Sequence, residues 1–155
     1  MNVKISAMVS AIALVCVCAT SAFAQKLDKS KVPAVVIQAF SQQFHGATRV
    51  KWELEEANMY EVNFRQQKTA VSAKFDQTGK LLETETAIKA IDLPASVLQT
   101  VKTQFAGFKI EEMEKIVFAN GSVAYELELE KGKQSLEVQF DVNGKVLKQE
   151  AEKKD

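Results

Sequence analysis

Apolar residues along this chain change from a helical spacing to a strand spacing, and the change happens twice. Between residues 33 and 46 the apolar positions follow one face of a helix, bracketed by a proline and a glycine. Apolar and polar residues then alternate over three short runs, at 50–54, 60–64 and 71–75, with a further strand expected at 80–85. Strict alternation is typical of antiparallel strands with one buried face. The pattern therefore predicts a helix followed by about four strands.

The second half of the chain repeats the first. The segment Val32–Gln38 recurs as Leu93–Gln99, and Tyr60 recurs as Tyr125. Both prolines and both tyrosines of the chain fall on matched positions, and a short insertion separates the helix from the tyrosine strand in the second copy. Such self-similarity indicates two copies of one supersecondary unit.

The predicted fold class is α+β, with two tandem units that each pack a helix on about four antiparallel strands. We expect the units at residues 25–87 and 88–150, followed by a polar tail at 151–155. The join is short and not rich in Gly or Ser, so the units should pack together in a sheet of up to eight strands. The helices would cover one face and leave a long polar face exposed.

Individual positions follow from this alternation. Phe75 and Phe140 precede matched turns and should point into the core. Lys51 and Glu61 should lie on the exposed face, where substitutions change stability little. Trp52 is in phase with the apolar residues of its strand, which favours a core position.

The first 24 residues have the character of a secretory signal peptide. Lys4 precedes an apolar run from Ala11 to Ala19, and Ala22 and Ala24 form an A-x-A arrangement before Gln25. The run is shorter than the roughly 20 apolar residues of a membrane span. We therefore expect cleavage after Ala24 and a periplasmic or secreted product without stable membrane insertion.

Cysteine content and charge narrow the possible functions. Cys16 and Cys18 lie in the signal segment, so the processed chain would have no disulfide, thiolate metal site or Cys nucleophile. Each follows a valine, which is unfavourable for lipid attachment. The chain has 20 basic and 20 acidic residues, without the basic excess of a nucleic-acid-binding protein.

Candidate catalytic or metal-binding residues are few. The single histidine, His45, follows the first predicted helix, where an interaction with the helix dipole is the simplest role. Asp76 and Asp141 each begin an Asp-x-x-Gly segment, but without the further acidic ligands of a calcium loop, so we interpret both as hairpin turns. We expect no catalytic, cofactor-binding or metal-binding residues, and we predict that the protein is not an enzyme.

Four glutamates of the second copy are the main candidates for partner binding. Glu126, Glu128 and Glu130 alternate along one predicted strand, and Glu137 lies on the next, while the matched positions of the first copy are mixed in charge. Two interpretations are open: a solvated face that keeps the sheet soluble, or a binding surface for a basic partner. Catalysis by paired carboxylates would need one of them buried or otherwise perturbed, which a solvated row does not provide.

Two aromatic residues of the second copy have no aromatic counterpart in the first. Phe108 and Phe118 fall in or near the insertion. They could be exposed anchors for a partner, since aromatic residues dominate interface energetics, or they could fill the core.

The repeated motifs resemble those of the PepSY-like, beta-lactamase-inhibitor-like family. They are V/L-P-x-x-V-I/L-Q, Q-F-x-G, Y-E-V/L and F-D-x-x-G-K-V/L-L, and the resemblance covers about residues 27–150. It implies paired α+β units like those of beta-lactamase inhibitory protein, which binds its enzyme with the open sheet face, and like the PepSY domains in propeptides of thermolysin-type proteases. The chain departs from that inhibitor in lacking its disulfides, and no loop motif can be matched to an inhibitory contact.

Two functions are compatible with these features. The first is an exported, non-catalytic binding or inhibitory module that engages a protein or peptide on the exposed sheet face, without a cofactor or nucleic acid. The alternative is an envelope small-molecule or cell-wall-linked binding factor that uses a crevice between the units. A large apolar pocket lined by an exposed Trp52 or Phe118 would favour the alternative, and a flat polar face would favour the first.

Processing of the N-terminus is directly testable. We expect mass spectrometry of protein recovered from the cell envelope or the medium to show an N-terminus at Gln25, because the small residues Ala22 and Ala24 suit a signal peptidase. A full-length chain, or one lipid-modified at Cys16 or Cys18, would contradict this prediction.

Overall fold

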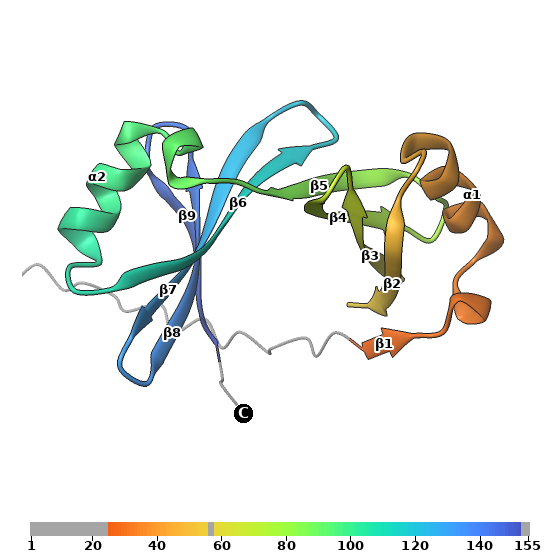
Figure 1. The fold of residues 1–155 in the computed structure, drawn as a ribbon, viewed down its shortest axis with the longest axis horizontal. Helices are drawn as coiled ribbons and strands as arrows, with labels where there is room; N and C mark the ends of the chain where they lie inside the picture. The colour runs from red at the N-terminus through yellow and green to blue at the C-terminus, as the bar shows by residue number, and fades with distance from the viewer. Residues whose placement is uncertain (1–24, 56–57, 153–155) are drawn as a thin grey trace, which may run out of the picture.

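The computed structural model describes residues 25–55 and 58–152, which form two α-helices and one large antiparallel sheet (Figure 1). The predicted signal peptide and residues 153–155 of the polar tail lie outside the described residues. The helices are α1 (Ala34–Gln43) and α2 (Ala95–Gln104), and short 3-10 helices precede them at Lys29–Lys31 and Ala90–Asp92. The strands are β1 (Gln25–Leu27), β2 (Thr48–Leu54), β3 (Met59–Gln66), β4 (Thr69–Asp76), β5 (Leu81–Ala87), β6 (Lys109–Phe118), β7 (Val123–Lys131), β8 (Gln134–Asp141) and β9 (Val146–Glu152).

All nine strands pair in sequence order, from β1 to β9. The α+β class and the antiparallel sheet are as predicted, but the limit of eight strands is wrong. The additional strand is β1, which pairs with the edge of β2 through Gln25 opposite Leu54 and Leu27 opposite Trp52. A three-residue strand has too few positions to show alternation, and its extended state depends on this partner far along the chain.

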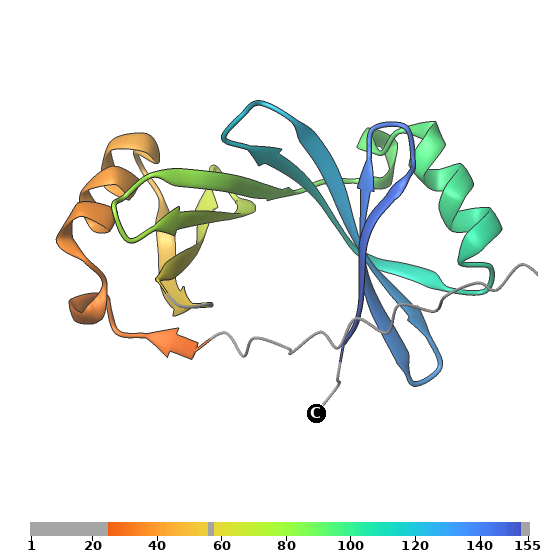
Figure 2. The ribbon, with the colours of Figure 1, turned by 180° about the vertical axis from the view of Figure 1, so that it is seen from behind.

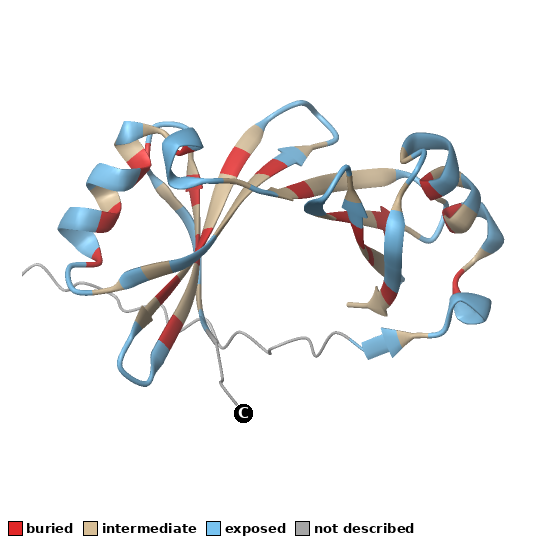
Figure 3. Cartoon of the chain, viewed as in Figure 1, coloured by how far each residue is buried: buried red, intermediate tan, exposed pale blue. Residues whose placement is uncertain are grey.

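Two separate apolar clusters hold the helices on the sheet (Figure 3). Val36 and Phe40 of α1 pack over β2, β3 and β4, where Phe75 is fully buried. Val97 and Val101 of α2 pack over β7 and β8, around the fully buried Phe140. The predicted core positions of both phenylalanines are thus confirmed.

Trp52 also lies in the core, as predicted. It is 4% exposed, and its ring meets that of Phe40 edge-on, with 5.4 Å between the centroids. Edge-to-face contact of this kind is a preferred arrangement for aromatic pairs.

The strand register places both helices on the same face of the sheet. Residues directly opposite each other in neighbouring strands share a face. Ala73 of the α1 cluster pairs with Thr84, Thr84 pairs with Val117, and four residues back along β6 Met113 pairs with Leu127 of the α2 cluster. Figures 1 and 2 show the result: the helices stand at opposite ends and the sheet arches between them.

The two Asp-x-x-Gly segments form hairpin turns, as predicted. Asp76 Oδ1 accepts hydrogen bonds from the backbone N–H groups of Thr78 and Lys80, at 2.8 and 3.1 Å. Asp141 Oδ1 accepts in the same way from Asn143 and Lys145, at 2.8 and 2.9 Å. Each aspartate therefore holds its own turn closed.

These turns also fasten the helices to the sheet. In the β8–β9 turn, Gly144 has a φ of +79° and lies so close to the carbonyl group of Ser96 that a Cβ atom would overlap it. Thr100 Oγ1 donates to the Gly144 carbonyl at 2.7 Å, and Ser96 Oγ donates to that of Val142 at 2.8 Å. Glycine is required here both for its backbone conformation and for this close approach.

The two buried phenylalanines should contribute strongly to stability. We expect Phe75→Ala and Phe140→Ala each to lower the free energy of unfolding by about 3–5 kcal/mol, because each removes a fully buried ring. Chemical denaturation followed by circular dichroism measures this. Lys51→Ala, at an exposed position, is the control and should change the value by less than about 0.5 kcal/mol. Midpoints that barely move for both phenylalanine variants would contradict the assigned core.

Candidate binding face

The sheet face that points away from both helices carries most of the charged side chains, and we call it the inner face. Its members follow from the register, because they alternate with the buried core residues. Acidic residues outnumber basic ones along it. The charged residues are Lys26, Lys51, Glu53, Glu61, Arg65, Lys74, Glu83, Glu85, Lys109, Glu112, Glu114, Glu126, Glu128, Glu130, Glu137, Lys148 and Glu150.

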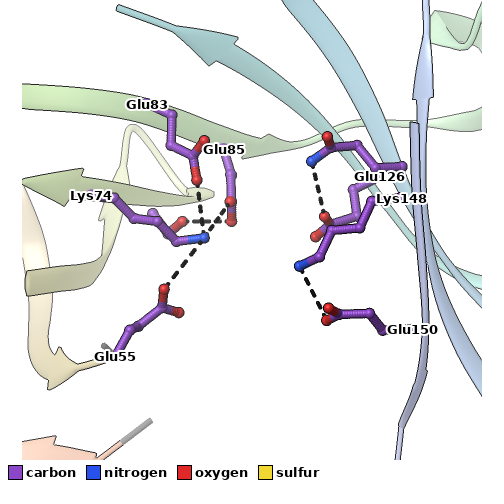
Figure 4. A network of polar contacts seen from close by, with 9 residues as sticks. Glu55, Lys74, Glu83, Glu85, Glu126, Lys148 and Glu150 are labelled. Carbon is purple, nitrogen blue, oxygen red and sulfur yellow. Dashed lines mark hydrogen bonds and ion pairs between the residues drawn. The ribbon is translucent and has the colours of Figure 1, made fainter. Parts of the chain in front are cut away.

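Lys74 on β4 is the cationic centre of the first half of the inner face. Its Nζ lies 3.0 Å from Glu83, 3.1 Å from Glu85 and 3.7 Å from Glu55 (Figure 4). Burial by itself would lower the pKa of Lys74, but the three carboxylates outweigh burial and raise it above its usual value. The ammonium group therefore stays charged and neutralises part of the acidic surroundings.

Glu61 on β3 forms a carboxyl pair with Glu55. Burial, the hydrogen bond with Glu55 and the charge of Glu55 raise the pKa of Glu61 to about 9. Burial by itself would raise the pKa of Glu55, but the hydrogen bond from Glu61 and the nearby Lys74 outweigh burial and lower it. Near neutral pH Glu61 thus keeps its proton and donates it to the Glu55 carboxylate. The expectation that Glu61 is an ordinary surface residue is wrong, because the arch and its neighbours shield it from water.

A second acidic group lies where the two halves of the sheet meet. Carboxylate oxygens of Glu85, Glu114 and Glu126, from β5, β6 and β7, all lie within 4.8 Å of one another. Burial, followed by the charges of Glu137 and Glu85, raises the pKa of Glu126 to about 8. Burial, followed by the charges of Glu85 and Glu112, raises that of Glu114 to about 7. Close carboxylates cannot all ionise without a cation nearby, so this group attracts positive charge.

One of these three carboxylates, that of Glu85, already has hydrogen-bond partners within the sheet. Glu85 is 7% exposed and accepts hydrogen bonds from Ser72 Oγ at 2.9 Å and Lys74 Nζ at 3.1 Å. Three carboxylates at this spacing could offer oxygen ligands to a cation, but the contacts of Glu85 leave chiefly Glu114 and Glu126 for an incoming charge.

The four glutamates proposed from the sequence share the inner face. Glu128 lies opposite Glu137, Glu126 lies opposite Gln139, and Glu130 lies opposite Ser135. Their description as a solvated row is wrong, because all four are partly buried. Ser135 Oγ donates to Glu128 at 3.2 Å, and the Gln139 amide donates to Glu126 at 3.5 Å.

The two halves of the inner face point towards the same space. In Figure 4, Lys74 and its carboxylates come from one side, while Glu126, Lys148 and Glu150 come from the other. Lys148 Nζ lies 3.1 Å from Glu150. Sequence reasoning missed Glu85 and Glu114, because their proximity to Glu126 depends on the β5–β6 register, for which the alternation gives no signal.

The remaining candidates have separate positions. Phe108 is partly buried against Phe105, with 6.3 Å between ring centroids, and Lys131 Nζ lies 5.5 Å from its ring. Phe118 pairs with Glu83 on the inner face and is partly buried. The side chain of His45 is exposed, and its carbonyl accepts a hydrogen bond from Gln66 Nε2 at 2.9 Å.

A nine-stranded antiparallel sheet with two helices on one face places the protein in an α+β class known from several solved structures. The sequence model of the putative beta-lactamase-inhibitor-like, PepSY-like family matches residues 19–83 and, a second time, residues 58–148. The chain therefore belongs to this family. The resemblance inferred from the repeated motifs is confirmed.

Several solved structures with this fold come from Bacteroides species. A protein of Bacteroides eggerthii described as a putative periplasmic protein has a TM-score of 0.69 at 16% identity, covering 77% of this chain and 88% of its own. A DUF2874 family protein of Bacteroides uniformis has a TM-score of 0.67 at 15% identity, with the same coverage. A BLIP-like protein of Bacteroides fragilis has a TM-score of 0.60 at 20% identity, covering 77% and 86%. At such identities the likeness concerns the fold.

Two further findings bear on the setting of the protein. A search of curated proteins gave no match. Among the described residues, no helix is long and apolar enough to cross a membrane.

The Glu55–Glu61 pair makes a pH dependence testable. The pKa of Glu61 is raised from 4.5 to about 9, so its stabilising contribution is fully present below about pH 4.5 and is lost as the pH rises towards 9. Glu61→Gln cannot ionise, and we expect its thermal midpoint to fall less than that of the wild type between about pH 5 and 9. Circular dichroism melts across this range measure the difference.

The matched control for this experiment is Glu111→Gln. Glu111 is exposed, so the variant should follow the wild type at every pH. If the Glu61→Gln curve also ran parallel to the wild type, Glu61 would not hold its proton in the folded protein.

Proposed function

We propose that the protein is an exported, non-catalytic module that binds a protein or peptide partner with its inner face. In this proposal the segments 25–87 and 88–150 are the tandem units, and removal of residues 1–24 delivers the protein to the periplasm or the medium. The observation that carries the proposal is a broad sheet face that neither helix covers and that is rich in carboxylates. An inhibitory role is one form of such binding, and the family description and the BLIP-like neighbour support it.

The charge of the inner face favours a basic partner. Glu114 and Glu126 hold raised pKa values because each carboxylate lies near others and is partly shielded from water. A lysine or arginine of a partner would remove this repulsion and would form charge-assisted hydrogen bonds with the carboxylates. Glu128, Glu130 and Glu137 extend the same acidic surface and add long-range attraction during encounter.

The contacts of the carboxylates support binding more than catalysis. Burial and raised pKa values are also features of catalytic acids, and in this respect the inner face differs from the expected solvated row. However, Glu85 and Glu55 are engaged by Lys74, and Glu61 is engaged by Glu55. Burial and the contact with Glu55 explain the raised pKa of Glu61, and burial with the charges of neighbouring carboxylates explains those of Glu114 and Glu126.

Neutralising two glutamates of the inner face should weaken binding. Glu126→Gln with Glu137→Gln retains side-chain size, so we expect the fold to persist. Association with the captured partner should slow by about tenfold at low salt and much less at about 1 M salt, where screening shortens electrostatic range to about 3 Å. The partner would be captured by a photo-crosslinking residue placed at Glu130, and rates would be measured by surface plasmon resonance at both salt concentrations.

A matched control variant tests whether the position of the changed charges matters or only the net charge of the protein. Gln99→Lys with Gln104→Lys makes the same change of two units in net charge, at exposed positions of α2 on the opposite face. This control should leave the association rate close to that of the wild type. Equal slowing by both variants would show that only net charge matters, and no slowing by either would place the interface away from the inner face.

A further inference from the structure

A cavity of about 450 Å³ lies at the edge of the sheet formed by β1 and β2, beside α1. Parts of α1, β1 and β2 line it. The lining takes in Lys26, Lys51 and Glu53 at the outer edge of the inner face, but none of the clustered carboxylates Glu61, Glu85, Glu114 and Glu126. The volume is in the range of ordinary small-molecule sites. An inference drawn from this cavity is thus independent of the function proposed for the inner face.

The path of the chain explains why the cavity forms here. β1 pairs with β2 only as far as Leu27 opposite Trp52. The chain then leaves the edge of β2 through the short helix Lys29–Lys31 and rises towards α1. Val50 lies two residues before Trp52 on β2. No residue of β1 pairs with it, and it is 40% exposed. The space between this edge and α1 becomes the cavity.

The deeper walls of the cavity are apolar. Ile37 and Phe40 contribute from α1, Leu27 from β1, and Val50 and Trp52 from β2. The edge-on contact between Phe40 and Trp52 fixes two of these walls. Such a surface takes a flexible hydrocarbon chain or a ring by removing apolar area from water on both sides.

The rim of the cavity is positively charged. Lys26, Lys29 and Lys51 line it with exposed side chains, and none of the three forms an ion pair with any residue in 25–55 or 58–152. Two acidic residues also lie at the rim. Asp28 accepts hydrogen bonds from the backbone N–H and hydroxyl of Ser30, and Glu53 lies opposite Lys26 in the register of β1 and β2, so the three lysines leave an excess of positive charge. Positive charge around an apolar cavity favours a ligand with a negative head group.

A buried donor also lies in the cavity wall. Trp52 is 4% exposed, and its indole Nε1 has no hydrogen-bond partner within the described part of the chain. Buried polar groups in folded proteins are normally paired, so an unpaired donor in the wall of a cavity is a sign of a missing acceptor.

We propose that this cavity binds a small amphiphile with an apolar chain and a single anionic head group, such as a fatty acid or an alkyl phosphate. The chain lies between Ile37, Phe40 and Val50, and the head group lies among the lysines of the rim. This ligand class matches both halves of the site: an apolar interior, and a rim with three lysines that form no ion pair within the described part of the chain.

Trp52 supplies a direct probe, because it is the single tryptophan of the chain. The processed protein is titrated with dodecanoate, dodecyl phosphate and dodecanol, each below its micelle-forming or solubility limit, and the tryptophan emission is recorded. We expect a saturable change with the two anions and affinity about three- to tenfold weaker for dodecanol, the loss expected for one or two exposed ion pairs. Comparing dodecanoate with dodecyl phosphate distinguishes a carboxylate ligand from a phosphate ligand.

Charge-matched variants locate the site. Lys26→Gln, Lys29→Gln and Lys51→Gln together should weaken dodecanoate binding to the level of dodecanol. Lys102→Gln, Lys133→Gln and Lys145→Gln together remove the same charge at exposed positions of the second half and should leave binding unchanged. Val50→Phe, at a partly exposed wall position, should reduce binding of all three compounds by filling the cavity, with Ser41→Leu as a second filling variant.

Three results would overturn the proposal. The first is the absence of a saturable response to either anion. The second is equal affinity for dodecanol and the anions, and the third is equal loss in the two sets of lysine variants. The partner-binding experiment changes Glu126 and Glu137, neither of which lines this cavity, so failure here leaves that experiment unaffected.

Discussion

The pairing of β5 with β6 is the interaction on which the arrangement of this protein depends. Glu83–Ala87 and the strand segment 114–118 form an antiparallel ladder that joins the two helix-covered halves into one sheet. Because opposite residues share a face, this ladder fixes both helices on one side and all the alternating charges on the other. A slip of one residue would move the whole charged set of the second half to the helix side.

The same ladder creates the electrostatic character of the inner face. It brings Glu85 of the first half beside Glu114 and Glu126 of the second, and the arch partly shields all three from water. Lys74 offsets the acids of the first half through three contacts. Charge excess therefore concentrates at the centre and in the second half, which is the part of the face best suited to a cationic side chain of a partner.

The inner face and the β1–β2 edge of the sheet offer different chemistry. The inner face is polar and acidic, while the cavity beside β1 has apolar walls and a rim of lysines. The cavity exists because β1 stops pairing at Leu27, which leaves the edge of β2 open beside Val50. Trp52 links this cavity to the core of the first half through Phe40, so a ligand there would contact the packing that holds α1.

The sequence alone determined the α+β class, the positions of both helices, the Asp-x-x-Gly turns and the inward position of Phe75, Phe140 and Trp52. These features depend on local periodicity and on the residue types in turns, both of which are determined by residues close together in the sequence. Periodicity also placed Glu126 and Glu137 on one face. Periodicity does not give the distances between side chains of neighbouring strands, so the predicted exposure of these glutamates was wrong.

Only the tertiary structure decided which side chains meet. The strand state of β1, the proximity of Glu85 to Glu126, the carboxyl pair of Glu61 and the cavity at Trp52 all depend on contacts between residues far apart in the chain. Alternation determines the face of a side chain, whereas register and curvature determine its neighbours and its exposure to water. Those neighbours set the pKa values and the shape of the sites.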